Sequence, residues 1–118
     1  MSYYRIFYVT TARPKVGKVD AAARWWDEKG RTQFESVPGT KSVHAFVVQF
    51  GLGGGGIFPF EIWQEIEDYA SFDRRDEFTE ANVATYRAFH TDFLEYYELG
   101  PCRIMGDWPV SRPGFRVA

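Results

Sequence analysis

The chain has 118 residues, of which 45% are hydrophobic and 19% aromatic, and its 14 basic and 16 acidic residues leave a formal net charge of −2 at pH 7. This length suits one hydrophobic core, so we expect a single domain over residues 1–118 with a C-terminal tail at about 109–118. Because acidic and basic residues are nearly balanced, the chain has no excess of basic residues to bind a phosphate backbone. We therefore do not expect nucleic acid as a partner.

The first half of the chain predicts a strand, a helix and a second strand. Residues 3–10 are mostly β-branched and aromatic, which is typical of a strand. Residues 15–37 carry apolar side chains at a helical period, and Pro38-Gly39 ends that helix. Residues 43–50 again form a strand-like run.

Two neighbouring tryptophans lie in the first predicted helix. Trp26 follows the apolar stripe of the helix, whereas Trp25 is out of step with it, and adjacent residues on a helix point in different directions. We therefore expect Trp26 in the core and Trp25 at an interface or over a pocket. Gly30 weakens the middle of this helix, because glycine is a poor helix former.

A hairpin with a glycine-rich tip is predicted next. Residues 60–67 alternate apolar and polar side chains, so they should form a strand that pairs with residues 43–50. Their connection holds four consecutive glycines, Gly53 to Gly56. Because neither a helix start nor a Lys-Ser or Lys-Thr pair follows these glycines, we expect a mobile loop rather than a phosphate-binding loop.

The last part of the chain predicts a long helix and a final strand. Residues 68–73 lead into a helix that runs to about Leu99 and ends at Gly100-Pro101, and residues 102–108 form the strand. One arc of this helix, about 160° wide, collects its apolar and aromatic residues together with an asparagine and a histidine. The arc consists of Phe78, Asn82, Tyr86, Phe89, His90, Phe93, Leu94, Tyr96 and Tyr97.

The predicted order of elements is that of a ferredoxin-like β-α-β-β-α-β sandwich, an α+β fold with two helices on one face of a four-stranded antiparallel sheet. The other face of the sheet then has no cover, although Trp63 and its aromatic neighbours fall on it. If two copies of the chain paired their sheets face to face, the uncovered face of each sheet would be buried, so we expect a homodimer.

Two segments carry a resemblance to a known superfamily. VPGTKSV at residues 37–43 joins the first helix to the second strand, and FEIWQEIEDYASFDR at residues 60–74 runs from the third strand into the second helix. Both resemble the dimeric α+β barrel superfamily, and the resemblance covers nearly the whole chain. The superfamily includes antibiotic-biosynthesis monooxygenases, haem-degrading monooxygenases, polyketide cyclases and NIPSNAP-like proteins. It implies a dimeric barrel and several possible activities.

The resemblance to haem-degrading members is incomplete. Those members carry an asparagine on the first strand and a tryptophan and a histidine on the second helix. Here the first strand reads YYRIFYVT and Trp63 lies on the third strand, so that only His90 matches. We therefore expect no haem and no other cofactor.

A candidate site is predicted on the second helix. His90 follows Tyr86 by about one turn within the apolar arc, so its ring should point toward the sheet. A buried neutral imidazole beside a tyrosine can act as a general base on a phenol, and we expect His90 and Tyr86 to be catalytic. The alternative is a core histidine that hydrogen-bonds a neighbour. The expected substrate contacts are Tyr8, His44, Trp63, Phe93 and Tyr97.

The remaining polar residues point more weakly to chemistry. His44 should face Glu65 or Trp63 across the hairpin, at the surface or in a dimer interface. The three glutamates within residues 61–67 share one strand face with Arg5 in reach, which predicts a salt-bridged barrel interior or a solvated edge, with a catalytic carboxylate as the alternative. Two histidines without ligand spacing predict no metal site.

Two functions follow from these residues and the resemblance. The first is a cofactor-independent monooxygenase or a cyclase that acts on an aromatic or polycyclic small molecule between the sheet and the helices. The second is a non-catalytic binding or assembly protein of the same superfamily, in which the aromatic residues only fill cores and an interface.

The single cysteine and the apolar runs bear on the compartment. Cys102 cannot close an intrachain disulfide, is expected to be a buried thiol and excludes a cysteine-rich zinc site. The N-terminal residues lack the basic region of a signal peptide, and no run reaches the roughly 18–20 apolar residues of a membrane span. We expect a cytoplasmic protein without membrane contact.

Overall fold

The computed structural model describes residues 5–49 and 58–108. The predicted mobility of the glycine loop and the predicted tail at about 109–118 lie outside the described residues. In chain order the elements are β1 (Ile6–Pro14), α1 (Val19–Trp25), the π-helical turn η1 (Trp26–Gly30), α2 (Arg31–Glu35), β2 (Thr40–Val47), β3 (Phe60–Ile66), α3 (Ser71–Ala81), α4 (Val83–Tyr96) and β4 (Tyr97–Gly106).

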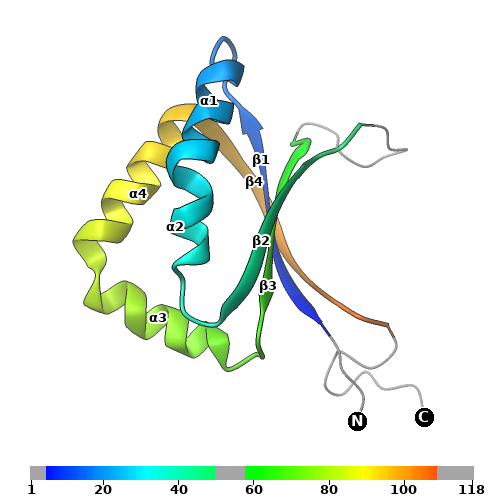
Figure 1. The fold of residues 1–118 in the computed structure, drawn as a ribbon, viewed down its shortest axis with the longest axis vertical. Coiled ribbons are helices and arrows are strands. Elements are labelled where there is room, and N and C mark those ends of the chain that lie inside the picture. The colour runs from blue at the N-terminus through cyan, green and yellow to red at the C-terminus, as the bar shows by residue number, and fades with distance from the viewer. Residues whose placement is uncertain (1–4, 50–57, 109–118) are drawn as a thin grey trace.

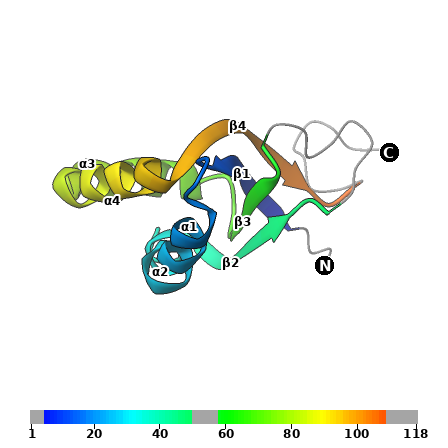
Figure 2. The same cartoon turned by 90° about the horizontal axis from the view of Figure 1, so that it is seen from above.

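The four strands form one antiparallel sheet in the order β2-β3-β1-β4. Figures 1 and 2 show the helices on one side of this sheet. This order of strands along the sheet, with helices between β1 and β2 and between β3 and β4, is the ferredoxin-like arrangement. The predicted α+β fold class is confirmed.

The strand register assigns each side chain to one face of the sheet. On β3, Phe60, Ile62, Gln64 and Ile66 are buried under the helices, on what we call the inner face. The alternating residues and their cross-strand partners point the other way, and we call this the outer face. The outer face comprises Phe7, Val9, His44, Phe46, Glu61, Trp63, Glu65, Arg103 and Met105.

The first helical region begins later than predicted and is wound in three pieces. Residues 15–18 form a turn in which the Lys18 amide donates to the Lys15 carbonyl at 2.9 Å, and Gly17 has a φ of 78°, so α1 starts only at Val19. The π-helical turn η1 then separates α1 from α2.

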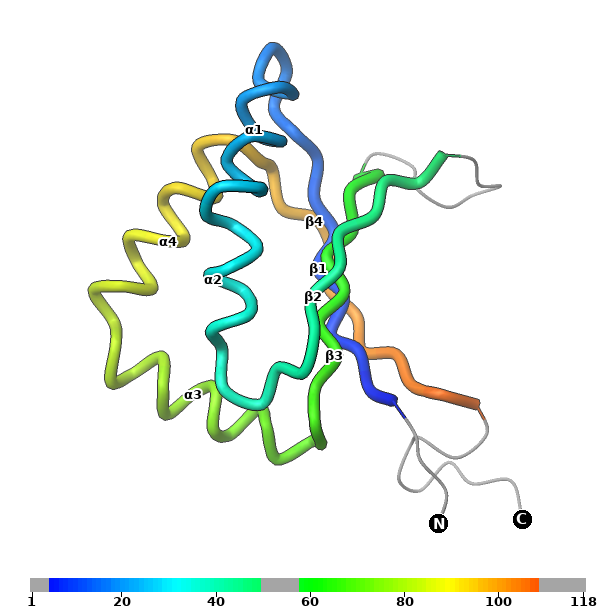
Figure 3. The backbone as a smooth tube through the Cα atoms, viewed as in Figure 1, coloured from blue at the N-terminus to red at the C-terminus, as the bar shows by residue number. Residues whose placement is uncertain are grey.

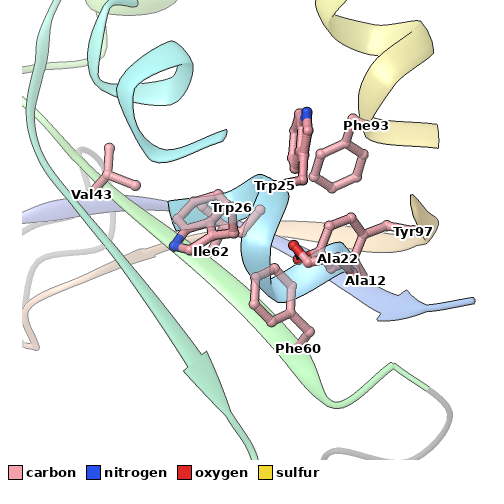
Figure 4. Close-up of a cluster of buried hydrophobic side chains, with 9 residues drawn as sticks. All are labelled: Ala12, Ala22, Trp25, Trp26, Val43, Phe60, Ile62, Phe93 and Tyr97. Atoms are coloured by element: carbon pink, nitrogen blue, oxygen red, sulfur yellow. Dashed lines mark hydrogen bonds between the residues drawn. The ribbon is translucent and has the colours of Figure 1, made fainter. Parts of the chain in front are cut away.

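Both tryptophans of this region are buried, so the prediction that Trp25 points away from the core is wrong. This helical region contacts both the sheet and α4, so two of its sides are covered. Trp26 contacts Phe60 on β3 at 5.8 Å between ring centroids, and Trp25 contacts Phe93 on α4 at 5.6 Å (Figure 4). A Cβ atom at Gly30 would lie only 2.7 Å from the Trp25 ring, so the close approach of the indoles requires glycine there.

The region after β3 differs from the predicted single helix. It breaks at Asn82, which has φ −126° and ψ 38°, and α4 ends at Tyr96. The prediction that Gly100-Pro101 ends the helix is wrong, because both residues lie within β4. The reason is the length of β1, which pairs with β4 as far as Pro14 opposite Tyr97. The chain therefore joins the sheet at Tyr97, before it reaches Gly100-Pro101.

Candidate functional site

A hollow of about 260 Å³ lies between the inner face of the sheet and the helices α2, α3 and α4. Figure 3 shows the course of the surrounding chain: α3 and α4 leave the sheet at the end of β3, run apart from α2 and rejoin the sheet at β4. Its lining is drawn from five elements and the loop after α2, and consists of Tyr8, Thr10, Phe34, Val37, Arg75, Tyr86, Phe89, His90, Phe93, Leu99 and Cys102.

One wall of the hollow is aromatic. Phe34 of α2 meets Phe89 of α4 edge to face, with ring centroids 5.2 Å apart, and Phe93 lies next to both. These rings continue the buried core, because Phe89 also stacks on Trp25 at 5.7 Å. A wall of this kind suits the face or edge of a flat aromatic ligand.

Another part of the lining holds a tyrosine and an arginine. The Tyr8 side chain is half-buried on the inner face of β1, and the Arg75 guanidinium carbon lies 4.8 Å from the centroid of its ring. Burial raises the pKa of the Tyr8 hydroxyl, the neighbouring Cys102 thiol raises it further, and Arg75 opposes the shift. The Tyr8 hydroxyl is therefore protonated at neutral pH and available as a hydrogen-bond donor.

Tyr86 contributes a second hydroxyl to the same hollow. Its ring is held edge to face by Phe78 at 5.6 Å, and its oxygen is buried without a hydrogen-bond partner within the described residues. Burial raises the pKa of the Tyr86 hydroxyl, and Arg75 and Thr79 oppose the shift. A buried hydroxyl without a partner is costly for the folded chain, and a ligand oxygen in the hollow would remove that cost.

His90 lies at the rim of the hollow and is exposed, so the expectation that the sheet buries its ring is wrong. The physical reason is the outward course of α4, of which Phe93 is the buried residue that packs on the core. His90 also lines a shallower hollow along α3 and α4 that includes Thr79 and Val83. Its position permits proton exchange with solvent as well as contact with a ligand.

The structure brings together four of the seven predicted site residues, namely Tyr8, Tyr86, His90 and Phe93. Tyr97 lies in the core instead, where its hydroxyl donates to the Ala22 carbonyl at 2.9 Å, and burial raises the pKa of that hydroxyl to about 12.

The other two predicted contacts, Trp63 and His44, lie opposite each other on the outer face of the sheet. The expectation that Trp63 and Phe93 contact the same substrate is therefore wrong, because the sheet separates them. His44 is exposed there, as its surface interpretation predicted.

Several lining residues escaped the sequence analysis. Arg75 lies in the charged run of residues 73–77, a pattern that predicts a solvent-exposed helix start. Phe34 and Phe89 follow apolar stripes that predict only core packing. Cys102 was expected to be buried, but it is exposed and lines the hollow, because it lies on β4, an edge strand of the sheet. Only the alternation of side-chain direction along the final strand could have identified Cys102 as a lining residue from the sequence.

The glutamates of the outer face are engaged in structural contacts. Glu61 accepts hydrogen bonds from Trp63 Nε1 at 2.9 Å and from Arg103 at 3.1 Å, and Glu65 pairs with Lys41 at 3.3 Å. Arg5 does not reach them but pairs with Asp107 at 2.9 Å. This supports the salt-bridged interpretation of the face over a catalytic carboxylate.

Within residues 5–49 and 58–108, no three His, Cys, Asp or Glu side chains are grouped so as to hold a metal ion. In the same ranges, no helix has the length and apolarity needed to cross a membrane.

Comparison with known proteins agrees with the fold. The sequence matches no family model and no curated protein. Among solved structures it is similar to the crystal structure of HapK from Hahella chejuensis, with a TM-score of 0.61 and 14% sequence identity, over 96% of this chain and 99% of that chain. At this identity the likeness extends to the small α+β fold alone.

Proposed function

We propose that this protein is a small enzyme that binds an aromatic molecule in the hollow and acts on it without a cofactor. The observation that carries the proposal is the composition of the hollow, which has an aromatic wall at Phe34 and Phe89 and a polar end at Tyr8, Arg75 and Tyr86. A mostly apolar cavity with a few convergent polar groups is the usual form of a small-molecule site.

In this proposal His90 moves the proton. Its ring at the rim accepts a proton from a phenolic or enolic oxygen of the ligand and releases it to solvent, while Tyr86 donates a hydrogen bond to the oxygen that becomes negative. Oxygenation and ring closure of an aromatic precursor both begin with the loss of such a proton. The proposal therefore includes a polyketide-type cyclase and a monooxygenase, in which dioxygen is the oxidant, the ligand supplies the electrons and the second oxygen atom leaves as water.

A non-catalytic binding protein with the same hollow is the second candidate, and one observation favours it. Among the described residues, none forms a hydrogen bond with the His90 ring. Catalytic bases are normally oriented by such a partner, so a ring without one suits a ligand carrier better than an enzyme.

The variant His90→Gln separates these candidates. Because His90 is exposed, the substitution should change the free energy of unfolding by less than about 0.5 kcal/mol. A thermal-shift screen of phenols and aromatic acids first identifies an aromatic substrate. The turnover of that substrate by the variant should be roughly 10²–10⁴-fold lower than by the wild type. Asp92→Asn, at an exposed position on the same helix, serves as the control. Normal turnover by a folded His90→Gln protein would reject the catalytic role and leave the binding protein.

We also propose that the chain forms a homodimer through the outer face, as members of the dimeric α+β barrel superfamily do. Phe46 and Met105 on this face are 52% and 37% exposed, and Phe46 contacts Trp63 at 5.9 Å between ring centroids. The glutamates beside them are already paired, so a second copy would bury an aromatic surface with little unpaired charge.

The cytoplasm is the proposed compartment. Cys102, the chain's single cysteine, is exposed and free, and a thiol of that kind persists most readily where the surroundings are reducing. A binding assay on the purified protein should therefore be run with a reductant present.

A further inference from the structure

Arg75 is a cation with no counterion in the part of the chain that the structure describes. It is half-buried on α3, and no carboxylate within the described residues forms an ion pair with it. Its neighbour Arg74 differs sharply, since it pairs with Glu67 and Asp68 at 3.3 Å each and donates to Ser71 at 2.8 Å. Partial burial of an unpaired charge costs free energy, which a bound anion would recover.

The groups around Arg75 are hydrogen-bond donors. The Tyr8 ring lies against its guanidinium, and the same guanidinium acts electrostatically on the hydroxyls of Tyr8 and Tyr86. Burial raises the pKa of both hydroxyls, so both keep their protons at neutral pH. The lining of the hollow includes no Asp or Glu within the described part of the chain. A site built from a cation and two O–H donors matches a group that only accepts hydrogen bonds and carries negative charge.

We infer that the polar end of the hollow, formed by Arg75, Tyr8 and Tyr86, binds an anionic oxygen of the aromatic ligand, either the carboxylate of a small aromatic acid or the phenolate that forms when His90 takes the phenolic proton. This inference rests on the proposed function, because it assigns the charge of the ligand in the same hollow. At about 260 Å³ the hollow lies just below the usual range for drug-sized ligands, which favours one or two rings over a large polycycle.

The test compares an anion with its neutral counterpart. Binding of 2-naphthoate and of methyl 2-naphthoate is measured by titration calorimetry on the full chain. The wild-type protein should bind 2-naphthoate at least tenfold more tightly, as expected for a charge-assisted contact with a half-buried guanidinium. A third titration with 4-nitrophenol, above and below its own pKa, separates a phenolate from a carboxylate as the preferred anion.

Two arginine variants assign the effect to one side chain. Arg75→Gln should lose about tenfold or more of its affinity for 2-naphthoate and keep its affinity for the ester, whereas Arg75→Lys should retain part of the preference. Arg74→Gln, next in sequence but paired outside the hollow, should leave both affinities unchanged. Circular dichroism on each variant verifies that it is folded.

The outcomes distinguish this inference from the proposed function. If the ester binds as well as the acid, or if Arg75→Gln keeps the preference for the acid, the anion inference is wrong while aromatic binding stands. If none of the three probes binds, both the inference and the proposed function are overturned.

Discussion

Replacing Trp25 with alanine is expected to lower the free energy of unfolding by about 3–5 kcal/mol, the range for removing a large aromatic residue from a core. Trp25 is only 6% exposed, and its ring contacts Phe89, Phe93, Tyr96 and Tyr97 at centroid distances of 5.6–6.1 Å. Its indole nitrogen is buried without a hydrogen-bond partner among the described residues, so the loss comes from packing. Chemical denaturation followed by circular dichroism measures it.

A graded series identifies the origin of this loss. Trp25→Phe keeps one ring against α4 and should lose clearly less stability than Trp25→Ala. Val16→Ala, at a fully exposed position, should stay within about 0.5 kcal/mol of the wild type. A Trp25→Ala protein as stable as the Val16→Ala control would mean that Trp25 points away from the core, as its position on the helix alone predicts.

Introducing a carboxylate at Phe46 is expected to convert the proposed homodimer into monomers. In a two-fold interface the substitution appears twice, and each unpaired charge buried there costs several kcal/mol. Sedimentation at micromolar concentration should give about twice the 13.7 kDa chain mass for the wild type and the chain mass for Phe46→Glu. Val16→Glu, which adds the same charge at an exposed position away from the outer face, should remain a dimer.

A monomeric wild-type protein under these conditions would contradict the dimer. A Phe46→Glu protein that remains dimeric would instead place the contact elsewhere than the outer face. Because Phe46 lies at the end of β2 rather than in the core, the variant is expected to keep its fold, and a normal circular dichroism spectrum verifies this.

The features that the sequence predicts well are set by neighbours in the chain. The alternation along Phe60 to Ile66 corresponds to the two faces of β3, because successive strand residues point in opposite directions. Pro38-Gly39 follows the end of the first helical region as predicted, and Gly39 takes a φ of 84° there, which favours glycine. The order of strands and helices follows from such local patterns.

The errors concern residues whose surroundings come from distant parts of the chain. Helical periodicity assumes one covered side, yet the helix of Trp25 is covered on two sides, by the sheet and by α4. Conversely, α4 carries an apolar arc but swings away from the sheet, so His90 in the middle of that arc is exposed. Pairing with the end of β1 likewise carries Gly100-Pro101 into a strand.

The candidate site was predicted in part for the same reason. Tyr8, Tyr86 and Phe93 belong to apolar patterns that place them on the inner side, and the hollow collects them there. Arg75 belongs to a run of charges that elsewhere would face water, and its role depends on a hollow between three helices and the sheet. No local pattern contains that information.

The most direct test of the central claim, that the hollow binds an aromatic molecule, is a set of intermolecular nuclear Overhauser contacts between a bound probe and the protein. With 2-naphthoate and then methyl 2-naphthoate at saturating concentration, the ring protons of the probe should show contacts to Phe34, Phe89 and Phe93, which line the hollow. Contacts confined to Phe46 and Trp63 on the outer face, or no contacts with either probe, would contradict it.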